Sequence, residues 1–147
     1  MFLSFRGEDT RTTFTSHLYS ALCNAGIVVF KDDVELPRGN CIKRKLMQAI
    51  GSSKIAILIF SKEYAGSKWC LEELSLIMEF HKSHEQVVLP VFYDVDPSEI
   101  RNQTSGFGEA FKDLIHRISP PEDIVSNWRI NLAKAGSIAG IVVLGSR

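Results

Sequence analysis

The feature that most limits the possible folds is a series of short apolar runs separated by long polar stretches. Each run is too short for a helix, and its apolar residues are continuous, which is typical of a strand buried on both faces of a parallel sheet. The longest wholly apolar run has six residues, against the roughly 20 needed to span a bilayer, so we expect no membrane partner. The runs predict strands at Phe2–Phe5, Ile27–Phe30, Ile55–Phe60, Val87–Tyr93 and Ile141–Leu144.

The stretches between these runs carry the apolar repeat of amphipathic helices. The repeat predicts helices over residues 10–25, 67–82, 104–118 and 122–135, with a shorter helix over 42–50. Strands that alternate with helices indicate an α/β domain with right-handed crossovers. Five of each favour a flavodoxin-like fold, a five-stranded parallel sheet flanked by helices on both faces. The 147 residues suffice for one domain, so we predict a single domain over 1–147.

Charge and cysteine content narrow the function classes. Lys and Arg number 17, as do Asp and Glu, so the totals show no nucleic-acid footprint, although a local basic patch stays open. The three cysteines, Cys23, Cys41 and Cys70, include no CxxC pair, so neither a disulfide scaffold nor a cysteine zinc site is expected. A reducing compartment fits this pattern, and we expect a cytoplasmic protein that could also enter the nucleus.

Motifs of several nucleotide-binding and hydrolytic sites are absent from the sequence. The chain has no GxxxxGK[ST] loop, no GxSxG elbow and no GxGxxG after a strand. The glycines of residues 106–108 are interpreted as helix-packing glycines. The third predicted strand is followed by Ser61, where a phosphoreceiver domain would need an aspartate at the strand's end.

Two pairs of side chains have spacings that a metal could use. His81 and His84 are three residues apart, and Asp94 and Asp96 flank a valine. Two ligands do not make a metal site, the histidines suit a helix C-terminus, and Pro97 makes the aspartate segment a turn. We therefore expect no metal.

The most informative segment, residues 61–74, leaves the third strand and enters a helix. Ligands of open α/β sheets bind at the carboxyl ends of the strands, so this segment should border a site. Helical spacing places Cys70 near the buried stripe as a small hydrophobe, with Trp69 and Glu73 together on a flank beside it. Glu73 is then a half-buried carboxylate beside an aromatic ring, while Glu72 points to solvent. Both acids could instead serve only the helix N-terminal dipole.

Several stretches carry a family likeness over nearly the whole chain. In chain order they resemble the plant-type TIR domain (Toll/interleukin receptor/resistance), the N-terminal signalling module of plant nucleotide-binding leucine-rich-repeat immune receptors. The resemblance implies a domain excised from a larger receptor. Met1 stands where the family usually has Asp-Val, and residues 136–144 differ from its usual helix ending. The matching stretches are 2–11 (FLSFRGEDTR), 14–18 (FTSHL), 36–39 (LPRG), 67–74 (SKWCLEEL), 91–98 (VFYDVDPS), 106–111 (GFGEAF) and Trp128-Arg129.

The resemblance also implies roles for individual residues. The family's catalytic glutamate matches Glu73, the substrate is NAD or NADP, no cofactor is implied, and the partner is a second copy bound through TIR–TIR interfaces. The implied substrate-binding residues are Phe5, Arg6, Gly7, Ser67 and Trp69. The loop that rearranges on assembly, the BB loop, matches Asp33, Leu36, Pro37, Arg38 and Gly39. The implied self-association residues are Ser16 and His17 on the first helix and Trp128 on the last.

A single glutamate is chemically sufficient for cleaving NAD. Nicotinamide leaves the ribose as a neutral molecule, so no general acid is needed, and one ionised carboxylate can stabilise the oxocarbenium-like transition state. Arg6 could hold the pyrophosphate or could pair with Glu8 or Asp9. We therefore predict a self-association-activated NAD glycohydrolase, with cyclisation as a further product left open. The alternatives are a non-enzymatic assembly module for immune signalling and a flavodoxin-like nucleotide binder of another kind.

Overall fold

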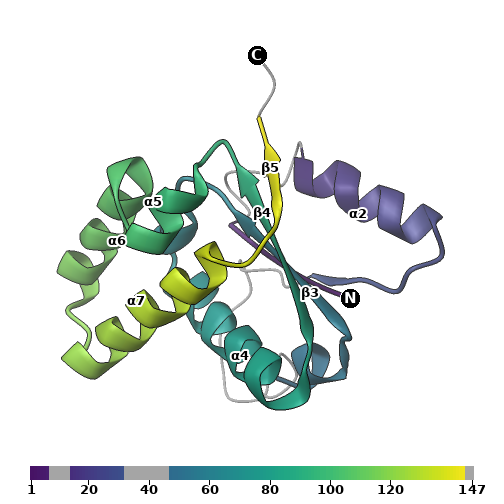
Figure 1. The fold of residues 1–147 in the computed structure, drawn as a ribbon, viewed down its shortest axis with the longest axis horizontal. Helices are drawn as coiled ribbons and strands as arrows, with labels where there is room; N and C mark the ends of the chain where they lie inside the picture. The colour runs from purple at the N-terminus through teal and green to yellow at the C-terminus, as the bar shows by residue number, and fades with distance from the viewer. Residues whose placement is uncertain (7–13, 32–46, 145–147) are drawn as a thin grey trace.

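The computed structural model describes residues 1–6, 14–31 and 47–144 (Figure 1). Strands and helices alternate in it along most of the described residues, and residues 47–52 are also helical. The elements are β1 (Phe2–Phe5), α2 (Phe14–Asn24), β2 (Phe30–Lys31), β3 (Ile55–Phe60), η1 (Tyr64–Gly66), α4 (Lys68–His84), β4 (Val87–Tyr93), α5 (Pro97–Asn102), α6 (Ser105–Ile118), α7 (Glu122–Gly136) and β5 (Ile141–Val143).

The strands form one parallel sheet in the order β2-β1-β3-β4-β5. This is the flavodoxin-like order, and it confirms the predicted α/β fold with a parallel sheet flanked by helices. β2 has only two residues, so the sheet consists of four strands of three or more residues and a two-residue edge. The carboxyl ends of β1 and β3 lie side by side, since Phe5 pairs with Ile59.

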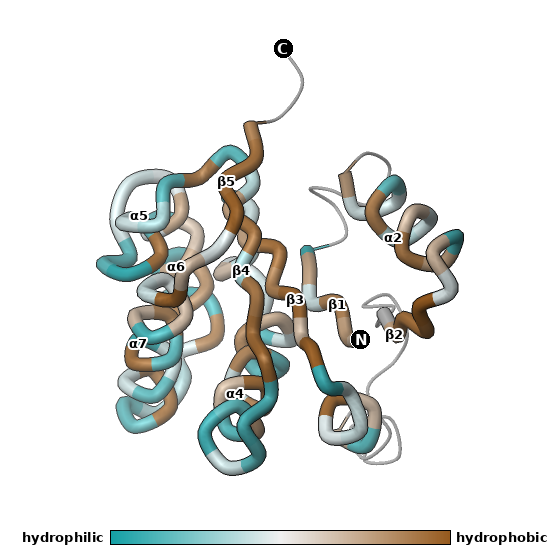
Figure 2. The backbone as a smooth tube through the Cα atoms, turned by 45° about the vertical axis from the view of Figure 1, so that its right-hand side comes forward, coloured by the Kyte–Doolittle hydropathy of each residue, from teal (hydrophilic) through white to brown (hydrophobic). Residues whose placement is uncertain are grey.

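Helices cover both faces of the sheet (Figure 1). Residues of β1, β3 and β4 alternate between two apolar clusters, as the pleat of a strand requires. One cluster joins Phe2, Leu58, Phe60 and Phe92 to α4, α6 and α7, and the other joins the intervening residues to α2. The strands are apolar along most of their length for this reason, as Figure 2 shows.

The structure differs from the sequence prediction mainly at the edges of the sheet. The run predicted as a strand at Ile27–Phe30 enters the sheet only at its last residue, and Val28 is 87% exposed. β5 ends one residue early, because Leu144 lies beyond the last paired residue and is exposed. Gly26 ends the turn after α2 with a φ of 82°, which confirms it as the predicted stop.

One helix was not predicted. α5 begins directly after Asp96, in the segment interpreted as a turn. The Asp96 carboxylate accepts the backbone N–H of Ser98 at 2.9 Å, and the Glu99 side chain accepts the N–H of Asp96 at 3.0 Å. With Pro97 at the first helical position, these contacts make a capping box, so the signal for a helix start was present in the sequence.

The glycines of residues 106–108 pack α6 as the sequence predicted. A Cβ on Gly108 would lie 2.2 Å from the Gln103 carbonyl oxygen, so only glycine allows α6 to begin this close to α5. Within the described part of the chain, no helix combines the length and apolar character needed to cross a membrane.

Candidate active site

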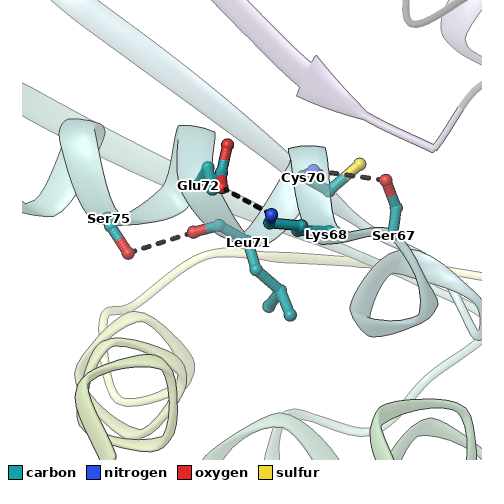
Figure 3. A network of polar contacts seen from close by, with 6 residues as sticks. All are labelled: Ser67, Lys68, Cys70, Leu71, Glu72 and Ser75. Carbon is teal, nitrogen blue, oxygen red and sulfur yellow. Dashed lines mark hydrogen bonds and ion pairs between the residues drawn. The ribbon is translucent and has the colours of Figure 1, made fainter. Parts of the chain in front are cut away.

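The N-terminus of α4 lies at the carboxyl end of the sheet. Ser67 caps the helix, and its hydroxyl accepts the backbone N–H of Cys70 at 3.2 Å (Figure 3). On the outer side of the helix, Lys68 and Glu72 form an ion pair at 3.8 Å. The Cys70 thiol donates to the Phe5 carbonyl at 3.5 Å, which ties this helix to the end of β1.

Glu73 lies on the sheet side of α4, where its side chain is almost completely buried. It is 1% exposed, and its Oε1 accepts a hydrogen bond from the Ser4 hydroxyl at 2.8 Å. The Ser4 hydroxyl also lies 2.7 Å from the Tyr64 hydroxyl. Tyr64 can in turn donate to the Cys70 carbonyl at 3.2 Å. We call Ser4, Tyr64 and Glu73, with the Cys70 carbonyl, the carboxylate cluster.

Three different elements supply this cluster, each for a local reason. Ser4 follows Phe2 by two residues on β1, so its side chain is directed to the same face of the sheet as Phe2, the face that α4 covers. Tyr64 belongs to η1, the short turn between β3 and α4, and its ring packs edge-on against Phe60 at 4.9 Å. The cluster therefore forms where β1 ends and where the chain crosses from β3 to α4.

The surroundings keep Tyr64 in its neutral form. Burial raises the pKa of the Tyr64 phenol well above its ordinary value of 10.0, and the neighbouring Cys70 and Glu73 raise it further. The hydrogen bond with Ser4 acts in the opposite direction and is the weaker influence. At neutral pH Tyr64 is therefore a hydroxyl donor beside the carboxylate.

Glu73 is more deeply placed than the sequence predicted. The prediction of a half-buried carboxylate is corrected to a fully buried one, because the side chain is directed from α4 toward Ser4 on the sheet. Glu73 is also the sixth residue of α4, beyond the first turn where the helix dipole acts most strongly. Stabilisation of the helix dipole therefore does not account for the place of Glu73.

The other implied substrate-binding residues fall around the same helix start, in part outside the described residues. Phe5 and Ser67 are buried and contact Cys70, at its thiol and its backbone N–H respectively. Trp69 is partly buried against the core, and Arg6 is partly buried directly after β1. Gly7 and the implied BB-loop residues, Asp33, Leu36, Pro37, Arg38 and Gly39, lie outside the residues that the structure describes.

The implied self-association residues are divided by the sheet. Ser16 and His17 lie on α2, where Ser16 is partly exposed and His17 is exposed. Trp128 lies on α7, which packs with the apolar cluster on the opposite face. Its side chain is only 3% exposed and packs in the core, and its role in self-association stays a prediction.

No metal site emerges in the described ranges, where no three His, Cys, Asp or Glu side chains gather as ligands. His81 is held by its Nδ1, 2.6 Å from the Gln86 carbonyl. A groove of about 600 Å³ runs between α4 and α7, lined in part by Leu76, Ile118 and Ile124. Glu73 is not among its lining residues, so this groove and the carboxylate cluster are separate places.

Sequence reasoning identified Glu73 but missed Ser4 and Tyr64. A signal for Ser4 was available, since it is the one polar residue of β1 in a run expected to be buried on both faces. A buried hydroxyl needs a hydrogen-bond partner, so a lone serine in such a strand marks a nearby polar group. Tyr64 offered no comparable signal, because a tyrosine after a strand is equally compatible with the surface.

Comparisons with known proteins agree with this geometry. The family model described as "TIR domain" matches residues 1–144. The chain belongs to the TIR-domain family. The TMV resistance protein N of Nicotiana glutinosa is 49% identical over 142 residues, which cover 95% of this chain and 12% of that protein. Disease resistance protein RUN1 of Vitis rotundifolia is 47% identical over 143 residues, covering 95% and 10%. This TIR chain thus spans about a tenth of the length of these relatives.

A solved structure has the same fold as this TIR domain. It is the TIR part of an activated Roq1 resistosome that directly recognizes the pathogen effector XopQ. It is 50% identical, covers 96% of this chain and 85% of that chain, and superposes with a TM-score of 0.85. The chain is therefore a TIR domain similar to those of plant disease-resistance proteins.

Proposed function

We propose that this TIR domain is an NAD(P)⁺ glycohydrolase that becomes active on self-association, with Glu73 as its catalytic carboxylate. The observation that carries the proposal is the place of Glu73. It is a buried carboxylate at the carboxyl end of the sheet, held by a serine hydroxyl at 2.8 Å. Open α/β sheets bind ligands at that end, and a buried, oriented carboxylate is more typical of function than of stability.

The proposed reaction breaks the bond between the ribose C1′ and the nicotinamide nitrogen. The bonding electrons pass to the pyridinium ring, nicotinamide leaves as a neutral molecule, and positive charge develops on the ribose. The ionised Glu73 stabilises that charge, which is greater in the transition state than in the substrate. Water then adds to C1′ and releases one proton, giving ADP-ribose. Attack by a group of the same molecule would give a cyclised product instead.

Burial of Glu73 is the reason why the proposal includes activation. A carboxylate that is 1% exposed does not meet a substrate that arrives from solvent. The surroundings of α4 must therefore change before NAD binds, and contact with a second copy is the proposed cause. By mass action the activity should then rise more steeply than linearly with protein concentration.

The test is nicotinamide release from NAD and from NADP at several protein concentrations, with light scattering to follow assembly. Glu73→Gln should abolish release, while Glu72→Gln should leave it unchanged, because Glu72 lies on the outer side of the same helix and pairs with Lys68. The proposal fails if Glu73→Gln remains active, or if the assembled native chain releases no nicotinamide.

A second candidate function is assembly without catalysis. It is favoured by the 50% identity to TIR domains of an activated resistosome, an assembled state of another receptor. Under this alternative the chain would self-associate, Glu73→Gln would assemble as the native chain does, and neither would release nicotinamide.

A further inference from the structure

We infer that Ser4 and Tyr64 are positioning residues, which hold Glu73 in one orientation through a directed chain of hydrogen bonds. The inference rests on the proposed function for its catalytic meaning. Its geometry stands independently, in the two short buried contacts that join Tyr64 to Ser4 and Ser4 to Glu73.

Counting protons gives the direction of the chain. An ionised carboxylate only accepts hydrogen bonds, so the single Ser4 proton is directed to Glu73 Oε1 at 2.8 Å. The Ser4 oxygen must then accept at its other short contact, and Tyr64 is the group at 2.7 Å. The Cys70 carbonyl, at 3.2 Å, is a more distant acceptor for the same phenol proton. Tyr64 therefore donates to Ser4, and Ser4 donates to Glu73.

Burial strengthens the hydrogen bonds of this chain and keeps water from replacing its members. Ser4 and Tyr64 are both 0% exposed, so the described structure leaves neither hydroxyl to solvent. Hydrogen bonds to a charged acceptor are stronger than neutral ones, and a second bond behind the first polarises it further. The pKa of Tyr64 is raised, mainly by burial, so its phenol keeps its proton when the carboxylate beside it is charged.

The two residues also fix where the carboxylate is directed. Ser4 belongs to the sheet, and the Tyr64 ring packs against Phe60 at 4.9 Å, so both donors are attached to rigid parts of the fold. Glu73 comes from α4, a different element. Contact with Ser4 thus couples the orientation of the carboxylate to the position of α4 over the end of β1, and a displacement of this helix would alter both.

The kinetic test compares Ser4→Ala and Tyr64→Phe with the native chain in the assembled state. In Ser4→Ala the charged Glu73 loses its direct hydrogen-bond donor, so kcat should fall by about 10-fold or more. The loss should be roughly 3-fold in Tyr64→Phe, which removes only the second donor and keeps the ring. KM should change less than kcat in both, since neither hydroxyl contacts substrate. The control is Ser75→Ala on the same helix, whose hydroxyl donates to the Leu71 carbonyl at 3.1 Å.

A second measurement separates this inference from the proposed function. The carboxyl ¹³C resonance of Glu73, assigned by its loss in Glu73→Gln, is followed from about pH 3 to about pH 9 in native and variant chains. The neighbouring groups are Ser4 of β1, Tyr64 of η1 and Cys70 of the same helix, and Arg6 follows β1 directly. Loss of the Ser4 donor should raise the midpoint by about one pH unit or more, because the charged form loses its hydrogen bond.

The outcomes of the two measurements are distinct. A raised midpoint in Ser4→Ala, with a smaller rise in Tyr64→Phe, supports the positioning chain even when the native chain releases no nicotinamide and the proposed function fails. An unchanged midpoint in both variants overturns the inference whatever the activity. Equal losses of kcat in Ser4→Ala and Ser75→Ala would also overturn it, since the effect would then belong to general packing.

Discussion

The sheet buries polar side chains at both of its ends, and the two ends use them differently. At the carboxyl end, the acid Glu73 is bonded side chain to side chain, through Ser4 to Tyr64. At the amino end, the neutral amide of Gln86 is 5% exposed and donates to two main-chain carbonyls, those of Ile50 and Ser53, at 2.6 and 2.7 Å.

The two buried polar groups have different roles in the fold. The Gln86 amide donates to the Ser53 carbonyl and gives the Ile50 carbonyl a second donor besides the backbone N–H of Ser53, so it completes the main-chain hydrogen bonding of the turn before β3. The Glu73 carboxylate accepts its hydrogen bond from a side-chain hydroxyl, that of Ser4, and burying a charge opposes folding. We therefore expect the amino-end amide to matter for stability and the carboxyl-end acid for chemistry.

The largest expected effect is that of replacing Glu73, which should abolish activity without lowering stability. Glu73→Gln keeps the side-chain shape and can still accept the Ser4 proton, but it carries no charge to stabilise the ribose cation. Nicotinamide release should fall by at least about 100-fold, the size of losing one electrostatic contact in an active site. The midpoint of thermal unfolding should stay the same or rise, because a buried charge is removed.

The control for that prediction is Glu72→Gln, assayed at the same protein concentration and the same degree of assembly. A large fall in the unfolding temperature of Glu73→Gln would contradict the comparison, since it would assign the carboxylate the structural role that we assign to Gln86.

The second effect is that of replacing Gln86, which should lower stability without changing activity. Gln86→Ala removes the amide donor of the Ser53 carbonyl and one of the two donors of the Ile50 carbonyl, which should cost about 1–3 kcal/mol of unfolding free energy. Urea unfolding measures this cost, and nicotinamide release per folded molecule should be unchanged. The matched control is Gln48→Ala, an exposed glutamine on the helix at 47–52, for which the change should be near zero.

Sequence reasoning predicted the centre of the molecule better than its edges. β1, β3 and β4 have the predicted bounds, because a strand buried on both faces leaves a continuous apolar run. Val28 and Leu144 belong to similar runs and yet stay exposed and unpaired, because the edges of the sheet need fewer apolar contacts. An apolar run shows that a segment can be buried. Whether it pairs as a strand depends on neighbouring segments that the local sequence does not specify.

The candidate site shows the same limit. Helical spacing identified the flank of α4 that carries Glu73, because that information is local to one helix. Ser4, the hydrogen-bond donor of Glu73, is 69 positions away in the sequence, and Tyr64, which bonds to Ser4, belongs to a third element. The cluster therefore depends on the packing of three elements. Trp128 also depends on long-range packing, since the contact of α7 with α4 buries a side chain that the resemblance associates with self-association.

The third effect concerns Asp96, an exposed carboxylate that has serine donors like those of the buried one. Ser98 donates its hydroxyl to Asp96 Oδ1 at 2.6 Å and its backbone N–H at 2.9 Å, and these bonds lower the pKa of Asp96. Asp96→Ala removes the cap of α5 and should lower the unfolding temperature by roughly 2–4 °C at neutral pH.

The pH dependence of that prediction follows from the direction of the shift. A carboxyl whose pKa is lower in the folded state stabilises the fold above its ordinary value of 3.8, and loses this effect as the pH falls through the folded value. The difference in unfolding temperature between native and Asp96→Ala should therefore be constant above about pH 5 and shrink below about pH 4. A difference that grows on acidification would contradict the assigned role.

The smallest expected effect is at the ion pair of Lys68 and Glu72. Glu72 directly precedes the buried Glu73 in the sequence. Their nitrogen and oxygen lie 3.8 Å apart, and the side chains are 61% and 34% exposed, so water and salt screen the pair. Glu72→Gln should change the unfolding free energy by no more than about 0.5 kcal/mol, and the change should vanish in about 1 M salt. Two adjacent glutamates would then have different roles: Glu72 is partly exposed and dispensable, while Glu73 is buried and required for the reaction. If Glu72→Gln lost nicotinamide release at both low and high salt, this distinction would be wrong. The reaction would then depend on a residue on the outer side of α4.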